Sequence, residues 1–238
     1  MGRLALIGGH SILGNEPEAG LERVVQPTEY GEVTVLASEG HLLLQRHGID
    51  RYTTAARIDH RANISALAAL DCDRILAIGS VGGLRPELGV GTFICPDDFI
   101  ALDHGVSFSD DHGGESIPGF DGSWRQRLLS AWARHSPVEM RDGGVYWQTI
   151  GPRFETPAEV RLLASHAHIV GMTIPSECVL AGELGIAYAA ICVVDNLANG
   201  VEGVPLTVED FEAGKELNRR KLLAGLEPLV AELGGDAS

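Results

Sequence analysis

The chain has 238 residues, 30 of them glycine, and a formal net charge of −15. So acidic a chain lacks the basic footprint that nucleic acids and anionic membranes require, which excludes both as expected partners. It has no apolar run long enough to cross a bilayer, and its four cysteines show no metal-ligand spacing, so we expect a reduced, cytoplasmic protein with no disulfide and no bound metal.

The first half of the chain alternates strand-like and helix-like segments. A short apolar strand at Leu4–Ile7 ends in two glycines, and Asn63–Leu70 carries apolar residues on one helical face. The remaining predicted strands are Thr34–Ala37 and Leu42–Arg46, which form a hairpin, followed by Arg74–Ile78, Thr92–Cys95 and Phe99–Leu102.

The second half continues this alternation. Thr156 is predicted to cap a helix, with Pro157 at its first position and Glu159 completing a capping box. The other predicted helices are Trp124–Ala133, Ser176–Leu184 and a long one from Thr207 to about Leu233, and the strands are Val145–Thr149, Ile169–Met172 and Tyr188–Val194. We therefore expect one α/β domain over residues 1–238, with a central, mostly parallel or mixed twisted sheet flanked by helices. Its active site should lie at the carboxyl ends of the strands.

Two segments offer groups that bind anions. Gly8-Gly9-His10-Ser11 follows the first strand, where backbone N–H groups of a glycine turn can close around an oxyanion; the alternative is an ordinary tight turn. Arg46-His47-Gly48 ends an apolar strand, and the planar fork of an arginine suits phosphate. Neither this first turn nor the later glycine-rich turn Gly79–Gly83 matches a dinucleotide fingerprint, and the chain has no Walker A motif or nucleophile elbow.

Glu155 and Asn196 form the sharpest chemical signal. Each follows a predicted strand, and together they offer a carboxylate and a carboxamide. A 6-oxopurine presents N1–H as a donor and O6 and N7 as acceptors, which a carboxylate and an amide complement, whereas adenine would place an acceptor against the carboxylate. The alternative is structural, with Glu155 serving the dipole of the next helix and Asn196 a turn.

Short matching segments occur along nearly the whole chain: Ile7-Gly8-Gly9, Arg46-His47-Gly48, Arg61-Ala62-Asn63-Ile64, Gly82-Gly83-Leu84, Gly151-Pro152-Arg153-Phe154-Glu155-Thr156, and Gly171-Met172-Thr173 with Glu177 and Asn196. In this order they resemble the trimeric purine nucleoside phosphorylases, within them the branch of methylthioadenosine and methylthioinosine phosphorylases. The resemblance implies a homotrimer that uses inorganic phosphate as co-substrate and no cofactor.

The resemblance also implies roles for individual residues. Glu155 and Asn196 would read the purine and act in catalysis, Val208 and Phe211 would border an apolar pocket for the 5′ group, and two further groups would hold phosphate (His10, Ser11, Arg46, His47 and Thr173) and the base and ribose (Ser80, Val81, Phe154 and Met172). The chain departs from the family pattern at several positions. His10 replaces a usual Thr or Ser, Arg51 a usual His, and Asp195 is an unusual residue before Asn196.

We expect phosphorolysis of a purine nucleoside, with a 6-oxopurine such as 5′-methylthioinosine, inosine or guanosine favoured by the pairing of Glu155 with Asn196. Methylthioadenosine phosphorolysis is the first alternative. A nucleosidase that uses water instead of phosphate is the second. The third is a non-catalytic nucleoside-binding protein, in which His10 and Arg51 mark a degraded phosphate site.

Overall fold

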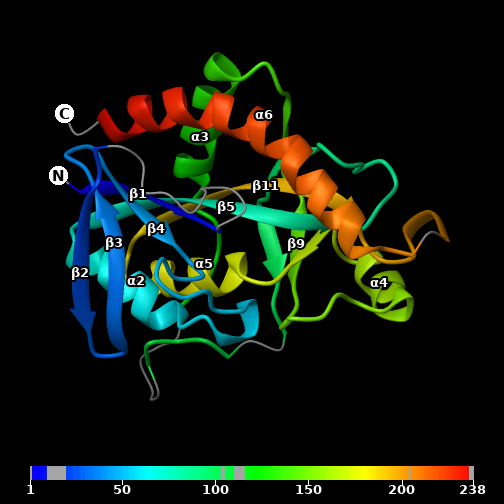
Figure 1. The fold of residues 1–238 in the computed structure, drawn as a ribbon, viewed down its shortest axis with the longest axis horizontal. Coiled ribbons are helices and arrows are strands. Elements are labelled where there is room, and N and C mark those ends of the chain that lie inside the picture. Colours follow the sequence, from blue (N-terminus) through cyan, green and yellow to red (C-terminus); the bar gives the residue numbers. More distant parts are fainter. Residues whose placement is uncertain (1, 10–19, 103–104, 110–115, 204, 236–238) are drawn as a thin grey trace.

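A computed structural model describes residues 2–9, 20–102, 105–109, 116–203 and 205–235. These residues form an eleven-stranded mixed sheet with helices on both faces (Figure 1). The strands are β1 (Arg3–Gly8), β2 (Glu22–Thr28), β3 (Gly31–Ala37), β4 (His41–Gln45), β5 (Cys72–Gly83), β6 (Phe93–Cys95), β7 (Asp98–Ile100), β8 (Met140–Asp142), β9 (Val145–Gln148), β10 (Ile169–Gly171) and β11 (Ala187–Leu197). The helices are α2 (His60–Ala69), α3 (Gly122–His135), α4 (Pro157–Ala164), α5 (Ile174–Glu183) and α6 (Val208–Gly235), with short 3-10 turns at Ala55–Arg57 and Val201–Gly203.

The centre of the sheet consists of the parallel strands β4, β1, β5 and β11. These strands are almost continuous apolar runs, as expected for strands covered on both faces. Beyond them the sheet continues as β10, β9 and β7 on one path and as β6 and β8 on another. The predicted α/β class with a mixed sheet is confirmed.

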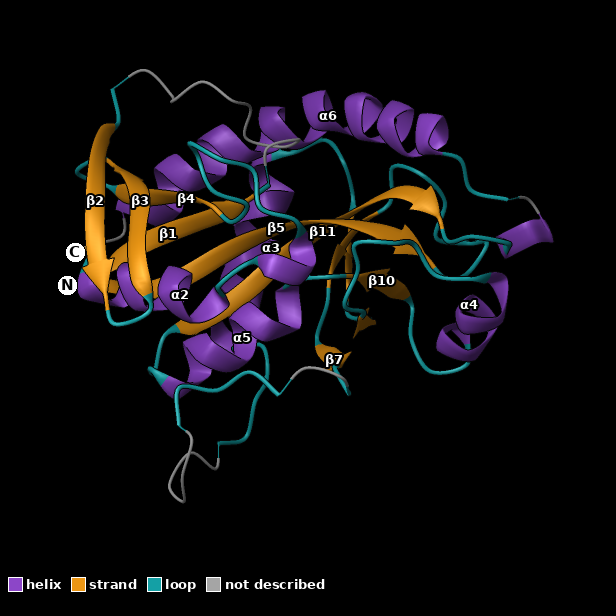
Figure 2. Ribbon diagram, turned by 60° about the horizontal axis from the view of Figure 1, so that its bottom comes forward, coloured by secondary structure: helices purple, strands orange, loops and turns teal. Residues whose placement is uncertain are grey.

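Two apolar layers hold the helices against the sheet. On one face, α2 and α5 pack through residues such as Ile64 and Ile174. On the other face, α3 and α6 pack through residues such as Trp132 and Leu229. Figure 2 shows the long strands β5 and β11 running side by side between these helices. None of the described helices is long and apolar enough to span a membrane.

Local sequence signals set the helix boundaries. Thr156 accepts a hydrogen bond from the Glu159 backbone, and the Glu159 side chain returns one to the Thr156 backbone, so the predicted capping box is confirmed. Thr207 likewise accepts from the Asp210 backbone at the start of α6. The capping box fixes the chain direction immediately after Glu155, at the end of the loop that leaves β9.

The ends of β5 and β11 shape the region where polar residues gather. Ser80 pairs with Val193 and Gly82 with Asn196, so one extra residue, Asp195, forms a β-bulge in β11. β10 runs antiparallel to the last part of β5, and its end leads directly into α5. The loop after β9, the turn before α5 and the end of β11 therefore meet at one place.

Candidate active site

A cavity of about 610 Å³ opens where these strand ends meet. Its wall contains ten of the residues that the sequence singled out: Arg46, His47, Ser80, Val81, Phe154, Glu155, Met172, Thr173, Asn196 and Phe211. They come from segments up to 165 positions apart in the chain, for example Arg46 and Phe211. Gly9 also lines the cavity, whereas the predicted His10 and Ser11 lie outside the described residues.

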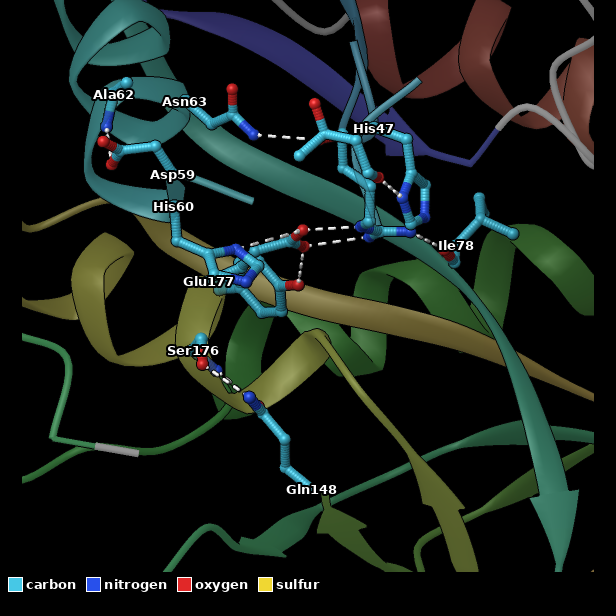
Figure 3. Close-up of polar contacts among 12 residues, drawn as sticks. His47, Asp59, His60, Ala62, Asn63, Ile78, Gln148, Ser176 and Glu177 are labelled. Atoms are coloured by element: carbon cyan, nitrogen blue, oxygen red, sulfur yellow. Dashed lines mark hydrogen bonds and ion pairs between the residues drawn. The ribbon is translucent and has the colours of Figure 1, made fainter. Parts of the chain in front are cut away.

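Arg46 is buried and held by a carboxylate. Its Nε and one Nη donate to the two oxygens of Glu177 at 2.6 and 2.9 Å, and the other Nη donates to the Ile78 carbonyl at 2.7 Å. Figure 3 shows Glu177 reaching from α5 across to this cluster beside Ile78. Burial alone would lower the pKa of Arg46, but Glu177 more than offsets this, and the net pKa is raised. Three of the five guanidinium N–H groups are thus engaged by described residues, which leaves two for a ligand.

Glu177 belongs to a wider buried network. Burial would raise the pKa of its carboxyl, but Arg46 outweighs this and lowers the pKa below its ordinary value. The Tyr188 hydroxyl donates to Glu177 at 2.7 Å, and His60 Nδ1 lies 3.9 Å from the carboxylate. The arginine that faces the cavity is therefore fixed in place by α5, β5 and β11.

His47 lies beside Arg46 with a defined ring orientation. Its Nδ1 is 2.7 Å from the Thr53 carbonyl, which can only accept, so Nδ1 carries a hydrogen and donates it. The ring stacks on Tyr52 with centroids 5.0 Å apart, and Tyr52 also lines the cavity. The hydrogen bond to Thr53 and the stack on Tyr52 together hold the ring in one orientation beside Arg46.

Glu155 and Asn196 face the same cavity from different elements. Thr149 donates to Glu155 Oε1 at 2.7 Å, which leaves the second carboxylate oxygen available as an acceptor. Asn196 Nδ2 donates to the Leu197 carbonyl at 2.9 Å, and this fixes which way the amide points. A Cβ on Gly82 would lie 3.1 Å from Val170 Cγ1 and 3.4 Å from Asn196 Nδ2, so the glycine relieves a tight contact with β10 beside the amide.

An aromatic and charged wall completes the cavity. Phe154 meets Phe211 of α6 edge to face at 5.4 Å, and the Lys215 ammonium lies 4.6 Å from the Phe211 ring centroid. Lys215 also pairs with Glu212 at 2.8 Å, and both line the cavity. The structure does not bring Val208 to this wall, since its side chain is 64% exposed at the start of α6. Of the two residues predicted to border a 5′ pocket, Phe211 lines the cavity beside a charged pair, and Val208 does not line it.

Met172 and Thr173 also line the cavity. Met172 packs against the backbone of the loop after β9, where a Cβ on Gly151 would lie 2.4 Å from its sulfur. Thr173 is buried at the N-cap of α5, where the helix N-terminus favours an anion, and its hydroxyl makes no capping bond among the described residues. Thr173, Arg46 and His47 together form the cationic and donor-rich part of the cavity.

Behind the wall lies a buried carboxyl group. Asp195 accepts hydrogen bonds from the Ser80 hydroxyl and, at 2.8 Å, from Asn218 Nδ2 of α6. Burial raises the pKa of Asp195, although the bonds from Asn218 and Ser80 oppose the shift. In the sequence, Asp195 stands out only as an unusual residue and Asn218 does not stand out, because nothing in the local pattern relates two positions 23 residues apart.

Comparison with known proteins identifies the family. The model of the family described as "Phosphorylase superfamily" matches residues 3–231. The chain belongs to the phosphorylase superfamily. One relative, a "Probable 6-oxopurine nucleoside phosphorylase" of Archaeoglobus fulgidus, is 35% identical over 97% of this chain and 96% of its own length.

Two further similarities extend this superfamily assignment. A "Probable S-methyl-5'-thioinosine phosphorylase" of Methanocaldococcus jannaschii is 35% identical over 95% of this chain and 91% of its own. Among solved structures, the methylthioadenosine phosphorylase of Schistosoma mansoni in complex with adenine has a TM-score of 0.82 at 23% identity, covering 99% of this chain and 93% of that one. This structural likeness confirms the phosphorylase fold.

The phosphorylase cavity contains residues that sequence reasoning missed. Tyr52, Leu206, Glu212 and Lys215 line it without having been singled out. For Glu212 and Lys215 a signal was available, because opposite charges three positions apart on a predicted helix form a pair. Tyr52 and Leu206 lie in irregular segments, where no periodicity indicates which way a side chain points.

Proposed function

We propose that this protein cleaves the N-glycosidic bond of a 6-oxopurine nucleoside by phosphorolysis, releasing the free base and a ribose 1-phosphate. One observation carries the proposal: Glu155 and Asn196 line the same cavity as Arg46, His47 and Thr173. A base-reading pair and an anion-binding group thus share a volume suited to a nucleoside. The names of the relatives from Archaeoglobus fulgidus and Methanocaldococcus jannaschii support the same reaction.

The base is read by complementary hydrogen bonding. Glu155 keeps one carboxylate oxygen for the N1–H of a 6-oxopurine, since the other is occupied by Thr149. Asn196 keeps one N–H for N7, since the other is given to the Leu197 carbonyl. Adenine would oppose its N1 lone pair to the Glu155 carboxylate, a mismatch that costs about 1–3 kcal/mol. Phe154 would cover the face of the purine, with Ser80 and Val81 nearby and Met172 against the ribose.

The chemistry follows from charge development during cleavage. The ribosyl C–N bond breaks through an oxocarbenium-like transition state, so positive charge grows on the sugar and negative charge on the base. Asn196 donating to N7 stabilises the departing base more in the transition state than in the ground state. Phosphate held by Arg46, His47 and Thr173 stabilises the cation and then bonds to C1′. The products retain every atom of the nucleoside and of phosphate, so the reaction requires no cofactor.

The assembly and location belong to the same proposal. The resemblance to trimeric phosphorylases supports a homotrimer, and the four described cysteines are all free and buried, which is consistent with a reducing cytoplasm. The strongly acidic charge supports small molecules rather than nucleic acid or membrane as partners.

Base release measured with and without phosphate tests the proposal. Inosine, guanosine, 5′-methylthioinosine, 5′-methylthioadenosine and adenosine are assayed in parallel with the purified protein. We expect phosphate-dependent release from the 6-oxopurine nucleosides, with kcat/KM at least about fivefold above that of the matching adenine nucleosides, as one mismatched buried hydrogen bond of about 1 kcal/mol or more implies. Equal release in phosphate-free buffer indicates a nucleosidase, and preference for methylthioadenosine contradicts the assigned base. Binding without turnover indicates a non-catalytic nucleoside-binding protein.

A further inference from the structure

The carboxyl group of Asp195 takes no part in the proposed reaction, yet it joins three walls of the cavity. It accepts from Ser80 of β5, it directly precedes Asn196 in β11, and it accepts from Asn218 of α6. Asn218 Nδ2 also donates to the Val194 carbonyl at 3.0 Å, so the amide is anchored twice. Asp195 is only 3% exposed, and a group so deeply buried keeps its bonds in a fixed geometry.

Side chains along β5 and β11 point alternately to the two faces of the sheet, which explains why Ser80 and Asp195 meet. Ile78 and Val193 pack into the apolar layer beneath α6, and Ser80 and Asp195 occupy the next positions along the same face. Ser80 is the first of these positions on β5 that lines the cavity, and Gly82 is the next. Its hydroxyl is therefore placed between the ligand space and the Asp195 carboxyl.

The chemistry of the pair fixes the polarity of Ser80. Ser80 donates its O–H to Asp195 Oδ2, so its only O–H hydrogen points away from the cavity. What Ser80 offers the ligand is a pair of acceptor sites. An unprotonated phosphate oxygen is itself an acceptor and could form no hydrogen bond with them, whereas an O–H group of a ligand could donate to Ser80.

Resting on the proposed function, we propose that Asp195 is a positioning residue that holds Ser80 as a hydrogen-bond acceptor for an O–H group of a substrate. That group is either a ribose hydroxyl of the nucleoside or the O–H of hydrogen phosphate. The charged groups that face Asp195 are Lys215 and Glu212 on α6, and they are paired with each other. The positive part of the proposed anion site thus remains with Arg46 and the α5 N-terminus.

Asp195→Asn tests the orientation without removing the link to α6. Asn218 keeps donating to the new amide oxygen, and the new NH₂ group faces Ser80 and turns its hydroxyl toward the cavity. We expect the KM of the substrate that carries the O–H group to rise about three- to tenfold, as for one lost hydrogen bond, with kcat and the unfolding midpoint nearly unchanged. A rise in KM for inosine assigns the ribose hydroxyl, and a rise in KM for phosphate assigns hydrogen phosphate.

Ser80→Ala separates positioning from a structural effect. In a protein that already carries Ser80→Ala, adding Asp195→Asn should change neither the KM for inosine nor the KM for phosphate. Ser80→Ala alone should raise the KM of the substrate whose O–H group it binds, and this test holds even if the Asp195 variant fails to fold. Asp98→Asn, the same change on β7 away from the cavity, should leave both values unchanged. Unchanged KM values in Asp195→Asn, a change that persists without Ser80, or a lower KM for phosphate would each overturn the proposal. Loss of phosphate-dependent turnover in the unmodified protein would instead refute the proposed function.

Discussion

At the scale of single residues, the pair of Arg46 and Glu177 shows how a buried charge is kept beside a ligand site. The arginine is 5% exposed and the glutamate 1%, so neither charge is solvated by water. Removing one partner of such a pair lowers the free energy of unfolding by more than the intact pair contributes to it, because the remaining ion is left buried without a counter-charge. The pair therefore acts as a support that keeps two N–H groups of Arg46 directed at the cavity.

Glu177→Gln is expected to destabilise the protein by about 3–5 kcal/mol at neutral pH, since it leaves Arg46 uncompensated. The pKa of Glu177 is lowered in the folded state from its ordinary value of 4.5. Its contribution is therefore complete above about pH 4.5 and is lost as the pH falls through the lower folded-state value. Urea unfolding at pH 7.5 and at successively lower pH should show the difference from the unmodified protein shrinking in acid. Glu227→Gln, an exposed change on α6, is the control, and a constant difference at every pH would contradict the argument.

A site residue could be predicted from the sequence only where the residues next to it indicate its role. Glu155 and Asn196 stood out because each follows a strand and together they match a purine edge. The contact of Asp195 with Asn218, and that of Arg46 with Glu177 131 positions away, depend on how distant elements pack. No local pattern records such packing, so the supports of the site were harder to predict than its reading groups.

At the scale of elements, α6 docks on the end of β11 through a glycine. A Cβ on Gly214 would lie 1.7 Å from the Asp195 carbonyl oxygen, which is backbone and cannot move aside. This close approach lets Asn218 reach Asp195 and brings Phe211 and Lys215 to the cavity. The start of α6 is therefore both a wall of the site and a tightly packed element.

Gly214→Ala should displace the first turns of α6. We expect a loss of about 1–3 kcal/mol in unfolding free energy, typical of overpacking, and a higher KM for the nucleoside because Phe211 and Lys215 move away. The matched control is Gly182→Ala on α5, where a Cβ meets nothing within 4 Å and the gain in helix propensity should stabilise by up to about 1 kcal/mol. Thermal and urea unfolding with steady-state kinetics measure both variants. Equal stability of the two would show that α6 does not depend on this approach.

The elements that sequence patterns predicted were those with strong local signals. The capping residues Thr156 and Thr207 begin helices where expected, and the apolar runs became β1, β5 and β11. The missed strands were β2, which contains Pro27 and is largely solvent-facing, and the three-residue β8. Their pairing with β3 and β6 stabilises them, so their own composition carries little signal.

At the scale of the whole molecule, the charge of −15 opposes the capture of an anionic substrate. Arg46 is the cation of the proposed phosphate site, and Glu177 already neutralises its charge. Binding of phosphate must then rest on short-range donors within the cavity, such as Thr173 and the remaining N–H groups of Arg46. A neutral nucleoside experiences no comparable long-range repulsion.

This contrast predicts opposite salt responses for the two substrates. Raising NaCl from about 10 to 150 mM shortens the Debye length from about 30 to 8 Å and screens the repulsion from distant carboxylates. We expect the KM for phosphate to fall by about two- to fivefold, while the KM for inosine stays constant. Initial rates in sodium chloride and sodium acetate of equal ionic strength separate screening from competition, because an anion that occupies the site would raise the KM for phosphate in one salt only. A KM for phosphate that rises equally in both salts would contradict this prediction, because it would mean that the protein attracts phosphate over long range. Such attraction requires a net positive electrostatic field around the cavity, and Arg46 paired with Glu177 cannot supply that field alone.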